Sequence, residues 1–120
     1  MDKRVQAVLA IIDQNWNRGA LKVSSLAQSV NLSTVRLQHL FKTATGKNIR
    51  AYIMDKRLTA AVNLLSKSNL TGKEVCHQVG FSNLPDFYRS FRKRFGTTPG
   101  AFRSASPTAL TKRKTDLTKN

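Results

Sequence analysis

The sequence predicts an all-α protein of about seven helices, built as two small helical lobes joined by one long linker helix. Three observations predict this fold class. Apolar side chains recur at spacings of three and four residues along most of the chain, as they do on one face of an α-helix. Capping residues and glycines divide this pattern into short segments. A large part of the pattern then repeats about 50 residues further along the chain.

The first lobe begins with two predicted helices. Apolar residues within 2–17 have the spacing of an amphipathic helix, which Gly19 is expected to stop. Ser24 or Ser25 is then expected to cap a short second helix, because a serine hydroxyl can accept from the free N–H groups at a helix start. Asn31 suits the left-handed turn that follows.

A third helix and the linker complete the first lobe. Ser33 is expected to cap the third helix, and Gly46 is expected to end it. Residues 48–66 then have the apolar spacing of one long helix, on the order of 25 Å long at about 1.5 Å per residue. The side chains predicted to face the core from the third helix are Leu37, Leu40, Phe41 and Ala44.

The second lobe repeats this order. Residues 71–74, Thr-Gly-Lys-Glu, have the form of a capping box, and Gly80 is expected to end the helix that they open. Ser82 or Asn83 is expected to cap the next helix, which Gly96 ends. A last short turn follows. The side chains predicted to face inward from these segments are Phe87, Phe91, Phe95 and Phe102.

An internal repeat relates the two lobes. Residues 26–33 match residues 75–82 in apolar character at an offset of 49, and after one added residue the match continues at an offset of 50. Each unit is therefore helix, tight turn and helix, the form of a helix-turn-helix, at residues 24–45 and 73–96. One such pair could be a helical hairpin that only packs against its neighbours. Two matching pairs in a strongly basic chain favour nucleic-acid binding.

The chain carries 21 Lys and Arg residues against 6 Asp and Glu residues, a formal net charge of +15. This balance favours a polyanionic partner, and double-stranded DNA is the first candidate. A membrane surface is the rival, but the sequence has no apolar run near about 18 residues and no signal-peptide pattern. We therefore expect a cytoplasmic, nucleoid-associated protein that does not bind a membrane. Residues 105–120, rich in Ser, Thr and Lys, are expected to form a basic, disordered tail.

No cofactor, metal site or catalytic centre is expected. Cys76, the one cysteine, cannot form an internal disulfide and lacks the companions of a zinc site, so it is expected to be a buried apolar side chain. The two histidines are 38 residues apart, and the sequence has no glycine-rich phosphate loop. Because the sequence offers no pair of a nucleophile and a base, an enzyme is the least supported class of function.

The side of the third helix opposite its core is a candidate DNA-reading surface. At about 100° per residue, it presents Val35, His39 and Lys42, with Gln38 at its edge. Val35 is either idle surface or a contact for a thymine methyl group. Gln38 can pair with adenine, and His39 can donate to a base or to a phosphate.

The corresponding helix of the second lobe presents Pro85, Arg89 and Arg92, with Tyr88 at the edge and Asp86 on a flank. Arg89 is the best candidate to read guanine, because its guanidinium fork fits O6 and N7 together. Pro85 is equally explained by the preference of proline for the start of a helix.

Phosphate contacts are expected from hydroxyl groups at helix starts and from basic side chains near the two recognition helices, which are the second helix of each helix-turn-helix. Each lysine taken alone is better explained as part of a solvated face. The residues predicted to contact phosphates are Ser24, Ser33, Lys42, Lys47, Lys73, Ser82, Arg92 and Arg94.

These residues resemble the DNA-binding domain of the AraC/XylS family of bacterial transcription regulators, whose small members are little more than that domain. The similarity runs from about Val5 to Arg103, which places the domain at residues 3–104. Its most specific part is Gly-Phe-Ser-Asn at residues 80–83, followed by Phe87, Arg89, Phe91, Arg92, Phe95, Gly96, Pro99, Phe102 and Arg103.

The resemblance implies that the two recognition helices enter successive major grooves on one face of the DNA. It also implies a regulator that acts through RNA polymerase, and we expect a monomer on the DNA. His39 stands where the family often has Arg, and Pro85 where it often has a polar side chain. A non-specific or architectural DNA-binding protein remains the alternative, because charge alone would explain it. The residues that the resemblance places against bases are Val35, Gln38, His39, Pro85, Asp86 and Arg89.

Overall fold

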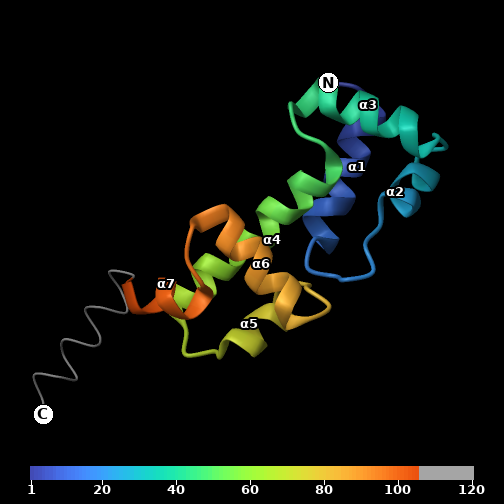
Figure 1. Ribbon diagram of the computed structural model, residues 1–120. Helices are drawn as coiled ribbons and strands as arrows, with labels where there is room; N and C mark the ends of the chain where they lie inside the picture. Colours follow the sequence, from blue (N-terminus) through green and yellow to red (C-terminus); the bar gives the residue numbers. More distant parts are fainter. Residues whose placement is uncertain (106–120) are drawn as a thin grey trace, which may run out of the picture. The chain divides into compact units, whose positions relative to one another are not determined.

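The computed structural model describes residues 1–105, and within them the chain forms seven α-helices and no strand (Figure 1). This confirms the predicted all-α fold. The disordered tail predicted for residues 105–120 falls, apart from Ala105, outside the described residues. The helices are α1 (Lys3–Asn15), α2 (Val23–Ser29), α3 (Thr34–Thr45), α4 (Ile49–Lys67), α5 (Gly72–Gln78), α6 (Leu84–Phe95) and α7 (Pro99–Ala105).

The chain divides into two compact units. Met1–Arg57 forms the first unit and the second begins at Leu58, so α4 starts in one unit and ends in the other. The long helix predicted for residues 48–66 corresponds to α4. None of the helices in the described part of the chain is long and apolar enough to cross a membrane.

The core of the first unit accounts for its apolar spacing. α1 buries Val5, Val8 and Ile12 completely, and α3 adds Leu37 and Phe41 to the same core. Helices as short as the seven residues of α2 are not stable alone, so this shared apolar burial is what holds them. The other buried members of this core are Leu26, Ala27, Ile49 and Ile53.

α1 ends earlier than the sequence predicts. Its last residue is Asn15, because the chain already turns where the Arg18 N–H donates to the Asn15 carbonyl at 2.9 Å. Gly19 lies outside the left-handed region, so the expectation that it stops the helix is wrong. A side chain of α4 binds the carbonyl groups that follow this helix end. Arg57 donates from Nε to the Trp16 carbonyl at 2.8 Å and from Nη2 to the Arg18 carbonyl at 2.9 Å.

α2 starts without a side-chain cap, which corrects the expectation that Ser24 or Ser25 caps it. The backbone is extended at Lys22 and helical from Val23 onward. Because Val23 packs against the core, that apolar contact determines where the helix begins. Both serines lie inside the first turn, and both are exposed.

α3 and α6 are bounded in the same way. The Ser33 hydroxyl accepts a first-turn N–H of α3 at 3.1 Å, as predicted. Of the two candidates in the second unit, Asn83 rather than Ser82 is the cap, and its side-chain oxygen accepts a first-turn N–H of α6 at 2.9 Å. Each helix ends at a glycine in the left-handed region, with φ of +80° at Gly46 and +76° at Gly96.

Phenylalanine rings fill the second unit. Phe87 and Phe91 are fully buried, and the Phe91 ring centroid lies 4.6 Å from that of Phe95 and 5.6 Å from that of Phe102. Cys76 is buried as predicted, and desolvation raises the pKa of its thiol. α5 opens with the predicted capping box. The other buried apolar residues of this unit are Leu58, Ala61, Leu65, Val75, Val79, Phe81 and Pro99.

Arg103 makes in the second unit the same kind of contact that Arg57 makes in the first. Its Nε donates to the Leu65 carbonyl at 3.0 Å and its Nη2 to the Ser68 carbonyl at 3.4 Å, at the end of α4. A helix end leaves carbonyl groups without intrahelical donors. In each unit, a guanidinium group from the last helix binds carbonyls at the end of the first helix.

Candidate nucleic-acid interface

The side of α3 that faces away from the core is the one that the sequence predicts. Because Leu37 and Phe41 are fully buried, the opposite side of the helix faces away from the core. On that side Val35 is 78% exposed, and His39 and Lys42 are exposed as well. An apolar side chain so far from its own core fits a contact with an apolar group of a partner, such as a thymine methyl group.

One core assignment on α3 is wrong. Ala44, expected to face inward, is exposed. The last turn of the helix directs Thr45 inward instead, where its half-buried hydroxyl donates to the Phe41 carbonyl at 2.8 Å. The core side of α3 therefore ends in a polar contact, and Leu40 lies half-buried against the core.

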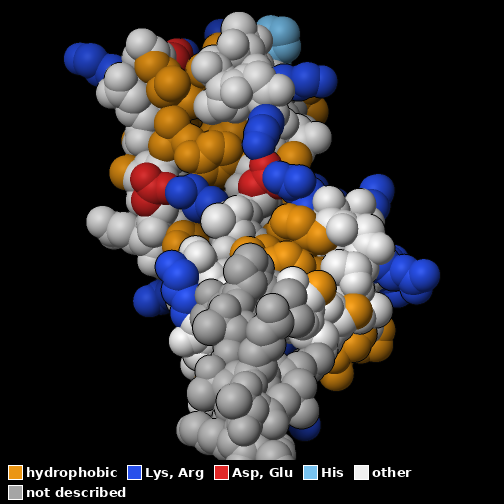
Figure 2. All heavy atoms as spheres, turned by 90° about the vertical axis from the view of Figure 1, so that its left-hand side faces the viewer, with side chains coloured by type: hydrophobic (Ala, Val, Ile, Leu, Met, Phe, Trp, Pro, Cys, Tyr) orange, Lys and Arg blue, Asp and Glu red, His pale blue; other side chains and the backbone are white. Residues whose placement is uncertain are grey.

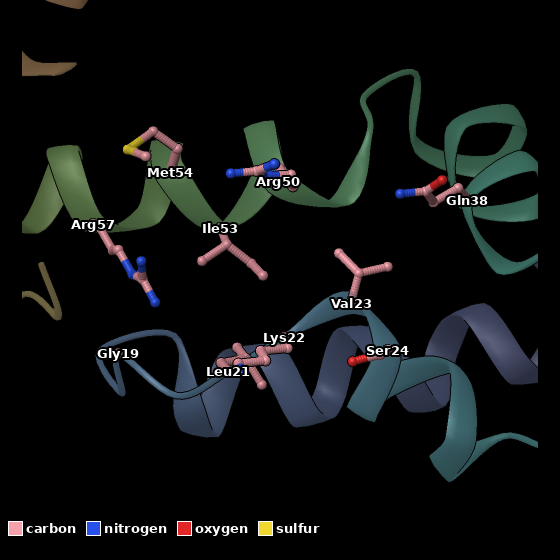
Figure 3. A pocket seen from close by; sticks show the side chains of 10 residues that line it. All are labelled: Gly19, Leu21, Lys22, Val23, Ser24, Gln38, Arg50, Ile53, Met54 and Arg57. Atoms are coloured by element: carbon pink, nitrogen blue, oxygen red, sulfur yellow. The ribbon is translucent and has the colours of Figure 1, made fainter. Parts of the chain in front are cut away.

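Two clefts border α3 within the first unit. The first, of about 460 Å³, lies between the start of α2 and the first half of α4 (Figure 3). The second has a volume of about 400 Å³. Gln38 and Arg50 line both, so a basic side chain of α4 borders the same surface as the predicted adenine reader. The first cleft is lined by Gly19, Leu21, Lys22, Val23, Ser24, Gln38, Arg50, Ile53, Met54 and Arg57, and the second by Gln38, His39, Lys42, Asn48 and Arg50.

Both clefts are positively charged. Lys22, Arg50 and Arg57 line the first, and Lys42 joins Arg50 in the second. No Asp or Glu of the described residues lines either one. Burial of the Arg57 guanidinium lowers the pKa of that side chain, and its hydrogen bonds hold it against the backbone. The more exposed cations, Lys22, Lys42 and Arg50, are the ones that can meet an anionic partner.

The carboxylates of residues 1–105 are engaged elsewhere. Asp13 accepts from Lys56 at 2.9 Å, and this hydrogen bond is the largest cause of the raised pKa of Lys56. Asp55 pairs with Lys47, and Glu74 closes the capping box of α5. On the face shown in Figure 2, the red carboxylates lie beside blue Lys and Arg side chains. The remaining pairs are Asp2 with Arg4 and Asp86 with Arg89.

α6 presents Arg89 with its guanidinium bound to a neighbour on the same helix. The Arg89 side chain is 76% exposed, and its Nη1 donates to Asp86 Oδ1 at 3.2 Å. The other carboxylate oxygen of Asp86 accepts from Asn83 Nδ2 at 2.9 Å. Asp86 thus has a partner on each oxygen, and it orients Arg89. Pro85 is exposed in the first turn of α6, a position that suits proline.

The predicted phosphate contacts of the first unit fall into two groups. Ser24 borders the first cleft and Lys42 the second, so the structure brings both close to the exposed side of α3. Ser33 uses its hydroxyl to cap α3, and Lys47 is held in an ion pair with Asp55.

The predicted phosphate contacts of the second unit lie on α5, on α6 and in the turn between them. Lys73, Ser82 and Arg92 are exposed, and Arg94 lies over the Phe95 ring at 5.4 Å from its centroid. Because Asn83 caps α6, the helix-start role expected of the Ser82 hydroxyl belongs to the asparagine.

Sequence reasoning missed Lys22 and Arg50. A helical projection of α3 ranks only the side chains of α3, whereas these two cations come from the start of α2 and from α4. The available signal was a basic residue at the third position of the predicted linker helix, which is weak by itself. Nothing among the described residues forms a group of three or more His, Cys, Asp or Glu side chains that could hold a metal ion.

Two helix pairs, each with a buried apolar side and an exposed basic side, define a helix-turn-helix protein of the DNA-binding class. The family described as "Helix-turn-helix domain" matches residues 26–105. The chain is 34% identical over 104 residues to the arabinose operon regulatory protein of Escherichia coli K12, an alignment that covers 87% of this chain and 36% of that regulator.

Solved structures of bacterial regulators are similar to this chain as well. The C-terminal domain of the response regulator yesN from Fusobacterium nucleatum is similar with a TM-score of 0.81 and 27% identity, over 85% of this chain and 99% of that one. The DNA-binding domain of AdpA, a global transcriptional factor solved in complex with a target DNA, is similar with a TM-score of 0.78 and 25% identity, over 84% of this chain and 90% of that one.

The chain belongs to the AraC/XylS family of helix-turn-helix transcription regulators, as the resemblance predicted. It spans about a third of the length of the first curated relatives, 35% of the Msm operon regulatory protein of Streptococcus mutans and 36% of the arabinose operon regulatory protein.

Proposed function

We propose that this chain binds a specific double-stranded DNA site as a monomer and regulates transcription from it. α3 and α6 enter successive major grooves, one from each unit, and the site is asymmetric, with two half-elements about one helical turn apart. The observation that carries the proposal is the exposed side of α3, where Val35 is 78% exposed and His39 is exposed as well. The two clefts that border α3 are lined by cations and by no Asp or Glu of the described residues.

Base reading is divided between the two recognition helices. On α3, Val35 contacts a thymine methyl group, Gln38 pairs with adenine, and His39 donates to a base. On α6, Arg89 reads guanine, and Asp86 holds its guanidinium in place. Pro85 packs against the base edges at the start of α6. The ion pair between Arg89 and Asp86 supports Arg89 as the guanine reader, because a side chain that is already oriented loses less conformational freedom on binding.

Backbone phosphates supply most of the affinity and its salt dependence. Lys42 is the strongest candidate of the first unit, because it is exposed in the cleft that also contains Gln38. Arg92 is its counterpart in the last turn of α6. The other proposed contacts are Ser24, Ser33, Lys47, Lys73, Ser82 and Arg94.

The regulatory output passes through RNA polymerase, which the bound protein recruits or blocks. The matched relative is named as the regulator of an operon, and a protein that occupies a promoter site can recruit or block the polymerase there. The place of action is the cytoplasm, at the nucleoid.

A non-specific or architectural DNA-binding role is the second candidate. The net charge of +15 favours it, because counterion release drives binding to any duplex. Such a protein would bind random and promoter DNA equally at matched salt, whereas the proposed function requires a preference of about a thousandfold or more.

Selection of bound sequences from a random duplex pool tests the proposal. We expect an enriched site with two conserved half-elements whose centres lie about 10 to 10.5 base pairs apart. Recovery of a single half-element would contradict the use of both units. Recovery of unenriched sequence would favour the non-specific alternative.

Two variants test the residue roles on the selected site. Arg89→Ala should relax the base preference at one position, at a cost of about 1 to 3 kcal/mol for the matched sequence. Lys42→Ala should weaken binding to all sequences by a similar factor. If Arg89→Ala left the selected sequence unchanged, the assignment of α6 as the guanine reader would be wrong.

A further inference from the structure

Arg50 has a position that the proposed DNA contacts do not use. It is the second residue of α4, it is exposed, and it lines both clefts beside α3. Gln38 is the other residue common to both clefts. Arg50 therefore borders the edge of the recognition helix from which Gln38 would reach a base.

Across the first cleft, Lys22 stands at the start of α2 (Figure 3). Within residues 1–105 the side chains of Lys22 and Arg50 form no ion pair and no hydrogen bond. The third cation of the cleft, Arg57, is half-buried and donates to two backbone carbonyls. Two uncommitted cations thus face a cleft that contains no carboxylate of the described residues.

The other lining residues and the position of the first cleft indicate which kind of anion Lys22 and Arg50 bind. Ile53 and Met54 of α4 are apolar residues of the lining. Gln38 and Ser24 supply polar atoms at the side nearest α3 (Figure 3). A carboxylate of this protein cannot fill the site from within the described residues, since each is engaged elsewhere. A DNA backbone beside a recognition helix in the major groove brings phosphodiester groups to the edge of that helix.

We propose that Arg50 and Lys22 bind one backbone phosphate of the DNA at the edge of α3, and that this contact sets how deeply Gln38 enters the groove. The proposal rests on the proposed function, because it requires α3 to lie in the major groove. The guanidinium fork of Arg50 donates to two phosphate oxygens, and the Lys22 ammonium adds a point charge from the opposite side. Arg50 is a positioning residue for Gln38 and carries no sequence information itself.

The first experiment compares Arg50→Ala with Lys3→Ala. Lys3 is exposed on α1 outside both clefts, so each variant removes one positive charge from the same unit. Affinity for the selected duplex is measured between about 50 and 200 mM salt, where the logarithmic slope falls by about 0.9 for each phosphate that the protein no longer neutralises. We expect Arg50→Ala to reduce the affinity about tenfold at low salt and the slope by up to about 0.9, and Lys3→Ala to reduce both far less.

The second experiment locates the phosphate. Duplexes with a single neutral methylphosphonate at successive backbone positions are bound to the original protein and to Arg50→Ala. We expect one position near the first half-element to weaken the original protein and to have a clearly smaller effect on Arg50→Ala, because only Lys22 still binds this phosphate in that variant. Lys22→Ala should also show a reduced effect at the same position, because only Arg50 still binds this phosphate in that variant. Circular dichroism of each variant checks that the helices are retained, and Arg50→Gln serves if the alanine variant unfolds.

Three outcomes would overturn the proposal. Equal slopes for Arg50→Ala and Lys3→Ala would show that Arg50 contributes only general charge. A changed base preference at an unchanged slope would make Arg50 a base reader. Methylphosphonate effects that add fully to that of Arg50→Ala would exclude a shared phosphate. All three can occur in a protein that still selects a two-element site, so they are distinct from a failure of the proposed function. If no site is selected, the slopes are measured on random duplex DNA.

Discussion

Replacing Arg57 with alanine tests how the first unit fixes the end of α1. The guanidinium of Arg57 donates to the Trp16 carbonyl at 2.8 Å and to the Arg18 carbonyl at 2.9 Å. The first bond is part-buried and the second is exposed. Arg57→Ala removes both donors, and it releases the segment that leads from α1 to Lys22 at the start of α2.

The expected magnitude follows from the exposure of each bond. A hydrogen bond from a charged donor contributes about 1.5 to 3 kcal/mol when its acceptor cannot be rehydrated. Water can replace the exposed bond to Arg18 at little cost, so the part-buried bond to Trp16 dominates. We therefore expect Arg57→Ala to lower the free energy of unfolding of the first unit by about 1.5 to 3 kcal/mol. For a unit of this size, each 1 kcal/mol lowers Tm by about 4 to 8 °C.

Urea unfolding followed by tryptophan fluorescence measures this effect directly, because Trp16 is the one tryptophan of the chain and lies at the affected contact. Arg57→Lys should recover less than half of the stability difference, since an ammonium group cannot present the two-donor fork. Arg36→Ala, an exposed arginine on α3, is the control for charge and should stay within about 0.5 kcal/mol. An Arg57→Ala variant as stable as this control would refute the assignment, because water would then satisfy both carbonyls.

Three further predictions concern the second unit. Gly96→Ala should destabilise it by about 1 to 2 kcal/mol in thermal unfolding, because φ is +76° there, and an unchanged Tm would refute the strain. The hydrogen bond from the Thr71 backbone N–H to the Glu74 carboxylate is the largest cause of the lowered pKa of Glu74. The stability that this carboxylate contributes is therefore present above the pKa of Glu74 in the unfolded chain, and it is lost as pH falls through the pKa of Glu74 in the folded chain. A pH series of urea unfolding below about pH 5 should thus be flatter for Glu74→Gln than for the original chain, and parallel curves would contradict this. Cys76 is buried with a raised pKa, so it should react with a thiol reagent only as fast as the unit opens, and rapid labelling of the folded chain at pH 8 would contradict its burial.

Most helical segments, and the exposed side of most helices, could be predicted from the amino-acid sequence alone. Amphipathic spacing and capping are local properties, so the fully buried faces of Val5, Val8 and Ile12 and of Leu37 and Phe41 follow from residues three and four apart. The same reasoning predicted the exposed position of Val35. It erred where packing competes with local signals: Val23 starts α2 before the serines, and Ala44 is left outside the core.

Contacts between side chains of different helices could not be predicted in this way, because they depend on how the helices pack. Arg57 reaches carbonyls about 40 residues earlier in the chain, and Arg103 does the same in the second unit. Arg50 borders the same clefts as Gln38 although the two belong to different helices. Helical periodicity fixes the direction of a side chain around its own axis, whereas the crossing of two helices depends on how their buried side chains interlock. The exposed side of α3 could therefore be predicted from the sequence, and the cationic clefts beside it could not.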